Sequence, residues 1–205
     1  HYFFPFFFLV ILLPYLGSLD IIAPQWLYLS LINLIVFVVL PSPIIPKSKF
    51  FYLLIFFVIQ SLISLLYSKN INLSIVDLSR IFITFFTIIN LFSFFKKSNF
   101  SFLFVSKILS LILLIEVAYS LIPLFAFLLL NDFSSYSEFY QIYSPNSFIG
   151  FAGNKNITAA SICIKLPFLI YLFYRSSIIN KLIYIILFFS SFLLIFFLRA
   201  RASYI

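Results

Sequence analysis

The sequence predicts an all-α fold, a polytopic bundle of transmembrane helices, and three observations lead to this prediction. The first is composition, since 64% of the 205 residues are hydrophobic and only 9% are charged, whereas soluble domains carry about 25% charged residues. The second is the length of the apolar runs, about 17–25 residues, which is the length that crosses a bilayer. The third is the short polar punctuation between the runs. A soluble protein is excluded, and the lipid bilayer is the expected partner.

Seven spans are expected, in a single transmembrane domain that covers residues 1–205. The breaks between them are polar or basic, as in PSPIIPKSK at 41–49 and KKSNFS at 96–101. The only sizeable loop, 131–157, separates the fifth span from the sixth. The expected spans are 3–19, 24–40, 50–67, 77–95, 102–124, 158–174 and 181–198.

The distribution of basic residues predicts the orientation, because short cytoplasmic loops are enriched in Lys and Arg. Every second loop is basic, through Lys47, Lys49, Lys96, Lys97, Lys107, Arg175 and Lys181. The loops between them hold only Lys69 and Lys155. This pattern places the first residue inside, the loop 131–157 outside, and Arg199 and Arg201 at the outer face. The net charge of +8 therefore reflects topology, and no nucleic-acid partner is expected.

Arg199 and Arg201 lie on the side where topology does not require cations. They either snorkel to the interface at a helix end or form an anion site, because a guanidinium matches phosphate oxygens with a forked pair of donors. Residues two apart on a helix point about 200° from each other. Both could therefore hold one ligand only if the chain leaves the helix there.

Two charges fall deep within spans, Glu116 and Lys165. They lie about 12 Å and 10 Å below the outer ends of consecutive antiparallel spans, so we expect an ion pair, either as a structural contact or as the floor of a polar cavity. Asn154, Thr158, Ser161 and Lys165 follow a four-three-four spacing. They should form a polar stripe on one face of the sixth span.

The other charges have simpler interpretations. Asp77 and Arg80 are spaced as a local ion pair, and Asp132 and Glu138 are expected to be solvated loop charges. No Ser-His-Asp set, metal-ligand spacing, phosphate-binding glycine loop or pair of coupled carboxylates can be assembled from the sequence. No metal or cofactor is expected.

The segment GFAGNKNITAASICIKLP at 150–167 breaks the apolar pattern. Gly150 and Gly153 would let the backbone turn tightly as it re-enters the membrane. Either Asn154 or Asn156 would cap the following helix. These residues are either a well-capped helix start and nothing more, or they also line a cavity at the outer face.

This segment and its continuation FLIYL, followed by LRARASYI at 198–205, resemble the O-antigen ligase and O-antigen polymerase membrane family. APQWLYLSLINL at 23–34 is also similar to the early spans of ligase-like members. Gly153, Asn154 and Asn156 match the first motif of the family, and Arg201 matches the arginine of the second. Ala200 stands where relatives commonly have Ser.

The resemblance implies a GT-C-like multi-helix fold and a metal-independent glycosyltransferase of the bacterial inner membrane, with its active face in the periplasm. Such an enzyme moves a glycan from undecaprenyl-pyrophosphate to lipid A-core or to another glycan in lipopolysaccharide biosynthesis. Arg201, with Arg199 as an extra cation, would bind the pyrophosphate. The residues expected to line the outer cavity are Gly153, Asn154, Asn156 and Lys165.

Family members carry a functionally important His in a later periplasmic loop. No catalytic residue is therefore expected within 1–205, and we expect the chain to be the N-terminal part of a longer protein, inactive alone. The main alternative is a polysaccharide flippase or other transporter, which would need a cationic cavity through the bundle and usually repeated halves. A subunit of a respiratory complex and a membrane scaffold are further alternatives.

Overall fold

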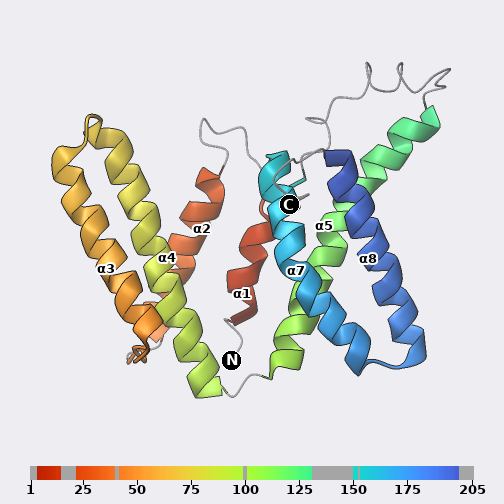
Figure 1. The fold of residues 1–205 in the computed structure, drawn as a ribbon, viewed down its shortest axis with the longest axis horizontal. Helices are drawn as coiled ribbons and strands as arrows, with labels where there is room; N and C mark the ends of the chain where they lie inside the picture. The colour runs from red at the N-terminus through yellow and green to blue at the C-terminus, as the bar shows by residue number, and fades with distance from the viewer. Residues whose placement is uncertain are drawn as a thin grey trace. The chain divides into compact units, whose positions relative to one another are not determined.

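The computed structural model describes residues 4–14, 22–39, 42–98, 101–130, 150–151 and 153–198. Within these ranges all regular structure is helical (Figure 1). The helices are α1 (Phe4–Leu9), the 3₁₀ turn η1 (Val10–Leu12), α2 (Ala23–Val39), α3 (Lys49–Ser64) with the 3₁₀ turn η2 (Leu65–Tyr67), α4 (Ile71–Ser98), α5 (Phe102–Leu130), α7 (Lys155–Arg175) and α8 (Ile178–Leu198).

Five helical segments in the described ranges are long and apolar enough to cross a membrane: Lys49–Tyr67, Ile71–Lys97, Phe102–Pro123, Lys155–Arg175 and Ile178–Leu198. The predicted all-helical, multi-pass character is therefore confirmed, but the count of seven spans is not. The 17-residue helix α2 is about 26 Å long at 1.5 Å per residue, slightly less than the hydrocarbon core of about 30 Å.

The prediction of one uninterrupted span over 3–19 is wrong. Helix α1 has six residues, η1 follows it to Leu12, and Leu13 is already extended, with φ −73° and ψ 122°. Pro14 explains this ending, because the ring of a proline pushes the preceding residue out of the helical region. Residues 15–19 lie outside the described ranges.

Three helix boundaries also differ from the prediction. Helix α4 begins at Ile71 rather than residue 77, because the side chain of Asn70 accepts a hydrogen bond from the Leu73 N–H. Helix α5 continues to Leu130 through Pro123, as membrane helices can when other groups satisfy the freed carbonyl. Helix α7 begins at Lys155 rather than residue 158, so the end of the expected loop 131–157 is helical.

The chain forms two compact units. The prediction of one transmembrane domain stays a prediction. The first unit comprises His1–Phe7 and Gln25–Phe100. In it, α3 and α4 form an antiparallel hairpin in which the ring of Phe51 stacks on that of Phe85 at 5.6 Å.

Two asparagines join α2 to α4 in the first unit. Asn33 donates from Nδ2 to the Thr87 hydroxyl at 2.8 Å, and its Oδ1 accepts from Asn90 Nδ2 at 2.8 Å. Both asparagine side chains are buried. Such contacts hold membrane helices together, because lipid surroundings provide no hydrophobic gain from helix association.

The second unit comprises Phe8–Pro24 and Ser101–Ile205, and its described helices α5, α7 and α8 lie side by side (Figure 1). Its buried core is formed by Leu113, Val117, Leu121, Ala159, Ile162, Leu166, Leu169, Leu187, Leu194, Ile195 and Leu198. The residues 176–177 link α7 to α8. This short link makes the two helices an antiparallel hairpin, so the start of α7 and the end of α8 lie at the same end of the unit (Figure 1).

Candidate functional site

The glycine segment forms a tight turn that leads into α7. Gly150 and Gly153 have φ angles of +67° and +64°, a region that glycine enters without steric cost, and the Gly153 N–H donates to the Gly150 carbonyl at 3.4 Å. Asn154 then caps the helix, since its side chain accepts from the N–H groups of Asn156 at 2.9 Å and Ile157 at 3.4 Å. Of the two expected caps, the structure selects Asn154.

The turn packs directly against α5 and α7. A Cβ added to Gly150 would lie 2.9 Å from the Oγ1 and Cγ2 atoms of Thr158 and 3.4 Å from the Ser120 hydroxyl. Both side chains are buried. The glycine therefore serves two purposes here, because it permits the left-handed backbone and lets the turn approach the buried side chains of Thr158 on α7 and Ser120 on α5.

Below this contact the structure forms the expected ion pair. Lys165 Nζ lies 2.6 Å from Glu116 Oε2, and each side chain is only 2% exposed. The Lys165 amine also donates to the Ser161 hydroxyl one turn earlier on α7. The expected polar stripe of α7 thus contacts α5 through Lys165, to which Ser161 of the same stripe is hydrogen-bonded.

This arrangement compensates a charge that is costly in a membrane. Insertion of a central lysine costs roughly 2.5–3.5 kcal/mol on translocon scales, and a carboxylate at hydrogen-bond distance offsets that cost. Two of the three N–H donors of Lys165 are used by Glu116 and Ser161. The pair fixes the register of α5 against α7, and the amine can reach a ligand only if the pair separates.

Ser120 is part of this column, although the sequence analysis did not identify it. It lies four residues after Glu116 on the same face of α5, and its hydroxyl is buried without a hydrogen-bond partner in the described part of the chain. The spacing from Glu116 was the signal that could have found it. Beside it, the half-exposed Tyr119 ring stacks on Phe151 of the turn, with centroids 3.9 Å apart.

An apolar cavity of about 800 Å³ lies between α7 and α8. It is lined by Cys163 and Leu166 of α7 and by Phe189, Ser190, Phe192, Leu193, Ile195 and Phe196 of α8. These α8 residues belong to the half of the helix that ends at Leu198, and Cys163 and Leu166 lie at the middle of α7. The cavity therefore extends from the middle of the hairpin toward the end of the unit that carries the glycine turn.

The remaining predicted residues divide into two groups. The side chain of Asn156 is exposed, whereas Gly153 and Asn154 are half-buried; their expected role in lining an outer cavity stays a prediction. Arg199 and Arg201 lie outside the described residues. So do Asp132 and Glu138, and the predictions for all four stay predictions.

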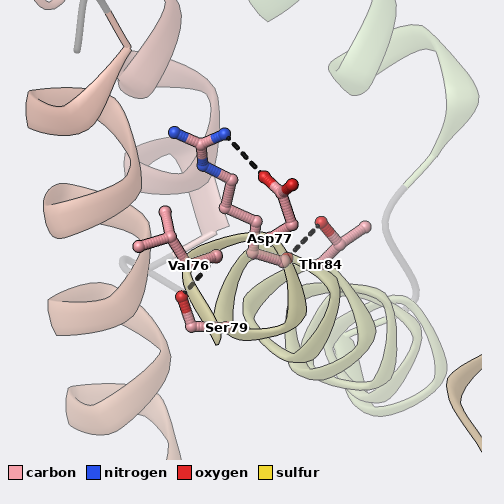
Figure 2. A network of polar contacts seen from close by, with 5 residues as sticks. Val76, Asp77, Ser79 and Thr84 are labelled. Carbon is pink, nitrogen blue, oxygen red and sulfur yellow. Dashed lines mark hydrogen bonds and ion pairs between the residues drawn. The ribbon is translucent and has the colours of Figure 1, made fainter. Parts of the chain in front are cut away.

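The expected pair of Asp77 and Arg80 is present on α4 in the first unit. Figure 2 shows the Asp77 carboxylate turned toward the guanidinium, and Arg80 NH1 lies 3.1 Å from Asp77 Oδ1. The hydroxyls of Ser79 and Thr84 donate to the carbonyls of Val76 and Arg80 on the same helix. All of these contacts are local to α4, and the Asp77 carboxylate is exposed.

Comparison of the chain with protein-family models, with curated proteins and with solved structures finds no match.

Proposed function

We propose that this chain contributes the donor-binding part of an O-antigen ligase or polymerase-like glycosyltransferase, which moves a glycan from undecaprenyl-pyrophosphate to a sugar hydroxyl. One observation supports the proposal above the others. The α7–α8 hairpin places the start of α7 and the end of α8 at the same end of the unit, and the arginine segment of the resemblance follows α8 in the sequence. The Asn154 cap begins α7, and Leu198, the residue before Arg199, ends α8 at the same end of the unit.

Covalent geometry limits how far the arginines lie from this end. Consecutive Cα atoms are about 3.8 Å apart, so the Cα of Arg201 lies within roughly 11 Å of that of Leu198. In this proposal the guanidinium binds a phosphate that is held beside the glycine turn. The apolar cavity between α7 and α8 would take the first isoprene units of the same carrier.

The chemistry requires charge neutralisation more than acid or base catalysis at the leaving group. The acceptor hydroxyl oxygen forms a bond to the anomeric carbon and releases its proton to water, and the bond from that carbon to the pyrophosphate oxygen breaks. The released undecaprenyl-pyrophosphate takes the electron pair and is a stable anion. A positioned guanidinium stabilises the charge as it develops, and the rigid turn and cap would hold the headgroup in place.

The contacts and burial of Lys165 help to distinguish a transferase from a transporter. A flippase would use a cationic cavity that passes through the bundle, and Lys165 is the deep cation that could line one. Its amine is bound to Glu116 and Ser161, and its side chain is only 2% exposed. This enclosure favours a structural role for Lys165 and favours the transferase over the transporter.

The proposal is tested in a bacterium that encodes the chain, by deletion of the gene and complementation with its full coding sequence. Loss of a ligase leaves lipid A-core without polymer, and loss of a polymerase leaves a single repeat unit, both visible on lipopolysaccharide gels. In each case the lipid-linked glycan should accumulate on the periplasmic side. Unchanged lipopolysaccharide would contradict the proposal, and accumulation on the cytoplasmic side would identify a flippase.

The role of the arginine is tested in the same strain and with the purified protein. Arg201→Ala should lower transfer by about 10²–10³-fold, the effect of removing one charge-stabilising donor, and Arg201→Lys should restore part of it. Arg175→Ala is the matched control, because Arg175 ends α7 at the opposite end of the same hairpin. Equal losses for Arg175 and Arg201 variants would show that the arginine effect is structural.

A further inference from the structure

One end of the first unit carries a set of lysines that lies outside the candidate functional site. It is the end where α3 begins and α4 finishes, and the exposed side chains there, called the lysine surface, are Lys47, Lys49, Lys96 and Lys97. The carboxylates in the described ranges are those of Asp77 and Glu116, and they pair with Arg80 and Lys165. The lysine surface is therefore positive and uncompensated within the described chain.

The backbone that carries these lysines is held in place. Lys97 Nζ donates to the Ser42 carbonyl at 2.8 Å, and the Ile44 N–H donates to the Ser93 hydroxyl at 2.8 Å, so residues 42–44 are tied to the last turns of α4. Ser48 then caps α3 by accepting from the Phe51 N–H at 3.2 Å. Lys97 thus has a structural role, whereas the amines of the other three lysines remain available.

The local helix geometry increases the positive potential. Lys49 occupies the first position of α3, where the helix dipole contributes about half a positive charge. A lysine is disfavoured there unless an anion is nearby. Lys96 and Lys97 lie in the last turn of α4. The negative end of the helix dipole offsets part of their charge there, but this turn contains no carboxylate.

Neighbouring aromatic residues place the amines at the level of lipid headgroups. Phe50 directly follows Lys49 and is 71% exposed, and Phe95 directly precedes Lys96 and is 38% exposed. These rings belong to helices that are apolar enough to cross a membrane, so they face hydrocarbon. The lysine next to each ring then lies at the boundary where phospholipid phosphates are found.

We propose that the lysine surface binds the phosphate groups of anionic phospholipids at the membrane leaflet on its side, the cytoplasmic leaflet in the expected orientation. The partner is a lipid and not a soluble phosphate, because the apolar faces of α3 and α4 next to the amines bind the acyl chains of the same molecule. Each lysine near an anionic surface strengthens the attraction about fivefold. This inference is independent of the proposed glycosyltransferase activity.

The test is native mass spectrometry of the full chain in detergent, titrated with phosphatidylglycerol, with phosphatidylcholine and with soluble glycerophosphate. The wild type should bind phosphatidylglycerol in preference to phosphatidylcholine. The triple variant Lys47→Gln, Lys49→Gln, Lys96→Gln should bind it on the order of 100-fold more weakly, about fivefold for each lysine removed. Lys97 is left unchanged because it holds the 42–44 segment.

Two controls distinguish the effect of removing charge from a folding defect and from non-specific electrostatic attraction. The triple Lys→Arg variant at the same three positions should retain the preference for phosphatidylglycerol. Lys69→Gln removes an exposed lysine from the opposite end of the same hairpin and should change binding less than Lys49→Gln does. Unchanged affinity in the triple Gln variant, an equal effect of Lys69→Gln, or glycerophosphate binding as strong as lipid binding would each overturn the proposal.

Discussion

The buried ion pair gives the sharpest prediction about stability. Glu116 and Lys165 are each 2% exposed, and their charged atoms lie 2.6 Å apart. Removing one partner leaves an uncompensated buried charge, which costs about 3–5 kcal/mol. If two such single losses were additive, Glu116→Gln and Lys165→Gln together would cost about 6–10 kcal/mol. Because they interact, the double variant should lose no more than the worse single variant.

This double-mutant cycle can be measured on the purified protein in detergent, by unfolding titrations that follow helix content by circular dichroism. Lys107→Gln is the control for loss of one positive charge, since Lys107 is exposed on the same helix as Glu116. This substitution should change the free energy of unfolding by no more than about 0.5 kcal/mol. A double variant whose loss equals the sum of the single losses, or a Lys165→Gln effect as small as that of Lys107→Gln, would refute the pair.

Three other substitutions test the turn, the cap and the amide contact, each by thermal unfolding in detergent. Gly150→Ala combines a φ of +67° with a Cβ that meets Thr158 at 2.9 Å, so it should cost about 1–3 kcal/mol; an unchanged midpoint would contradict the tight approach. Asn154→Ala should cost about 1 kcal/mol through loss of the cap, whereas Asn156→Ala, whose side chain is exposed, should leave stability nearly unchanged. Asn90→Leu removes the hydrogen bond to Asn33 and should cost about 0.6–1.7 kcal/mol; a gain in stability would mean that apolar packing dominates there.

The sequence predicted the long helices well because span length and apolar composition are local properties. It failed where one residue ends or starts a helix. Pro14 ends the first helical stretch through its effect on Leu13, and Asn70 starts α4 early. The general hydrophobicity of both regions concealed these local effects.

The candidate site could be predicted where the position of a residue in the sequence determines its depth in the membrane and the helix face on which it lies. Equal depth in antiparallel neighbours was enough to pair Glu116 with Lys165. The choice of Asn154 over Asn156 as the cap depended on the backbone angles of the turn, which spacing does not give. Ser120 was missed although its spacing of four residues from Glu116 places it on the same face of α5, because a serine within an apolar run is otherwise inconspicuous.

The polar contacts also explain how differently α5 and α8 hold α7. The α5–α7 interface contains the Glu116–Lys165 ion pair, a directional contact that fixes register. The described contacts of α8 with α7 are apolar packing and a cation–π contact, in which Lys181 Nζ lies 5.5 Å from the centroid of the Phe173 ring. The buried Ser191 hydroxyl of α8 donates to Leu187 on its own helix. Register between α7 and α8 therefore depends on packing and on the short link at 176–177. The start of α7 is consequently held to α5 through the ion pair further along the helix, whereas its distance from the end of α8 depends on the fit of Leu194 and Leu198 in the core. A cavity in that core would shift the end of α8 relative to the glycine turn and leave the ion pair intact.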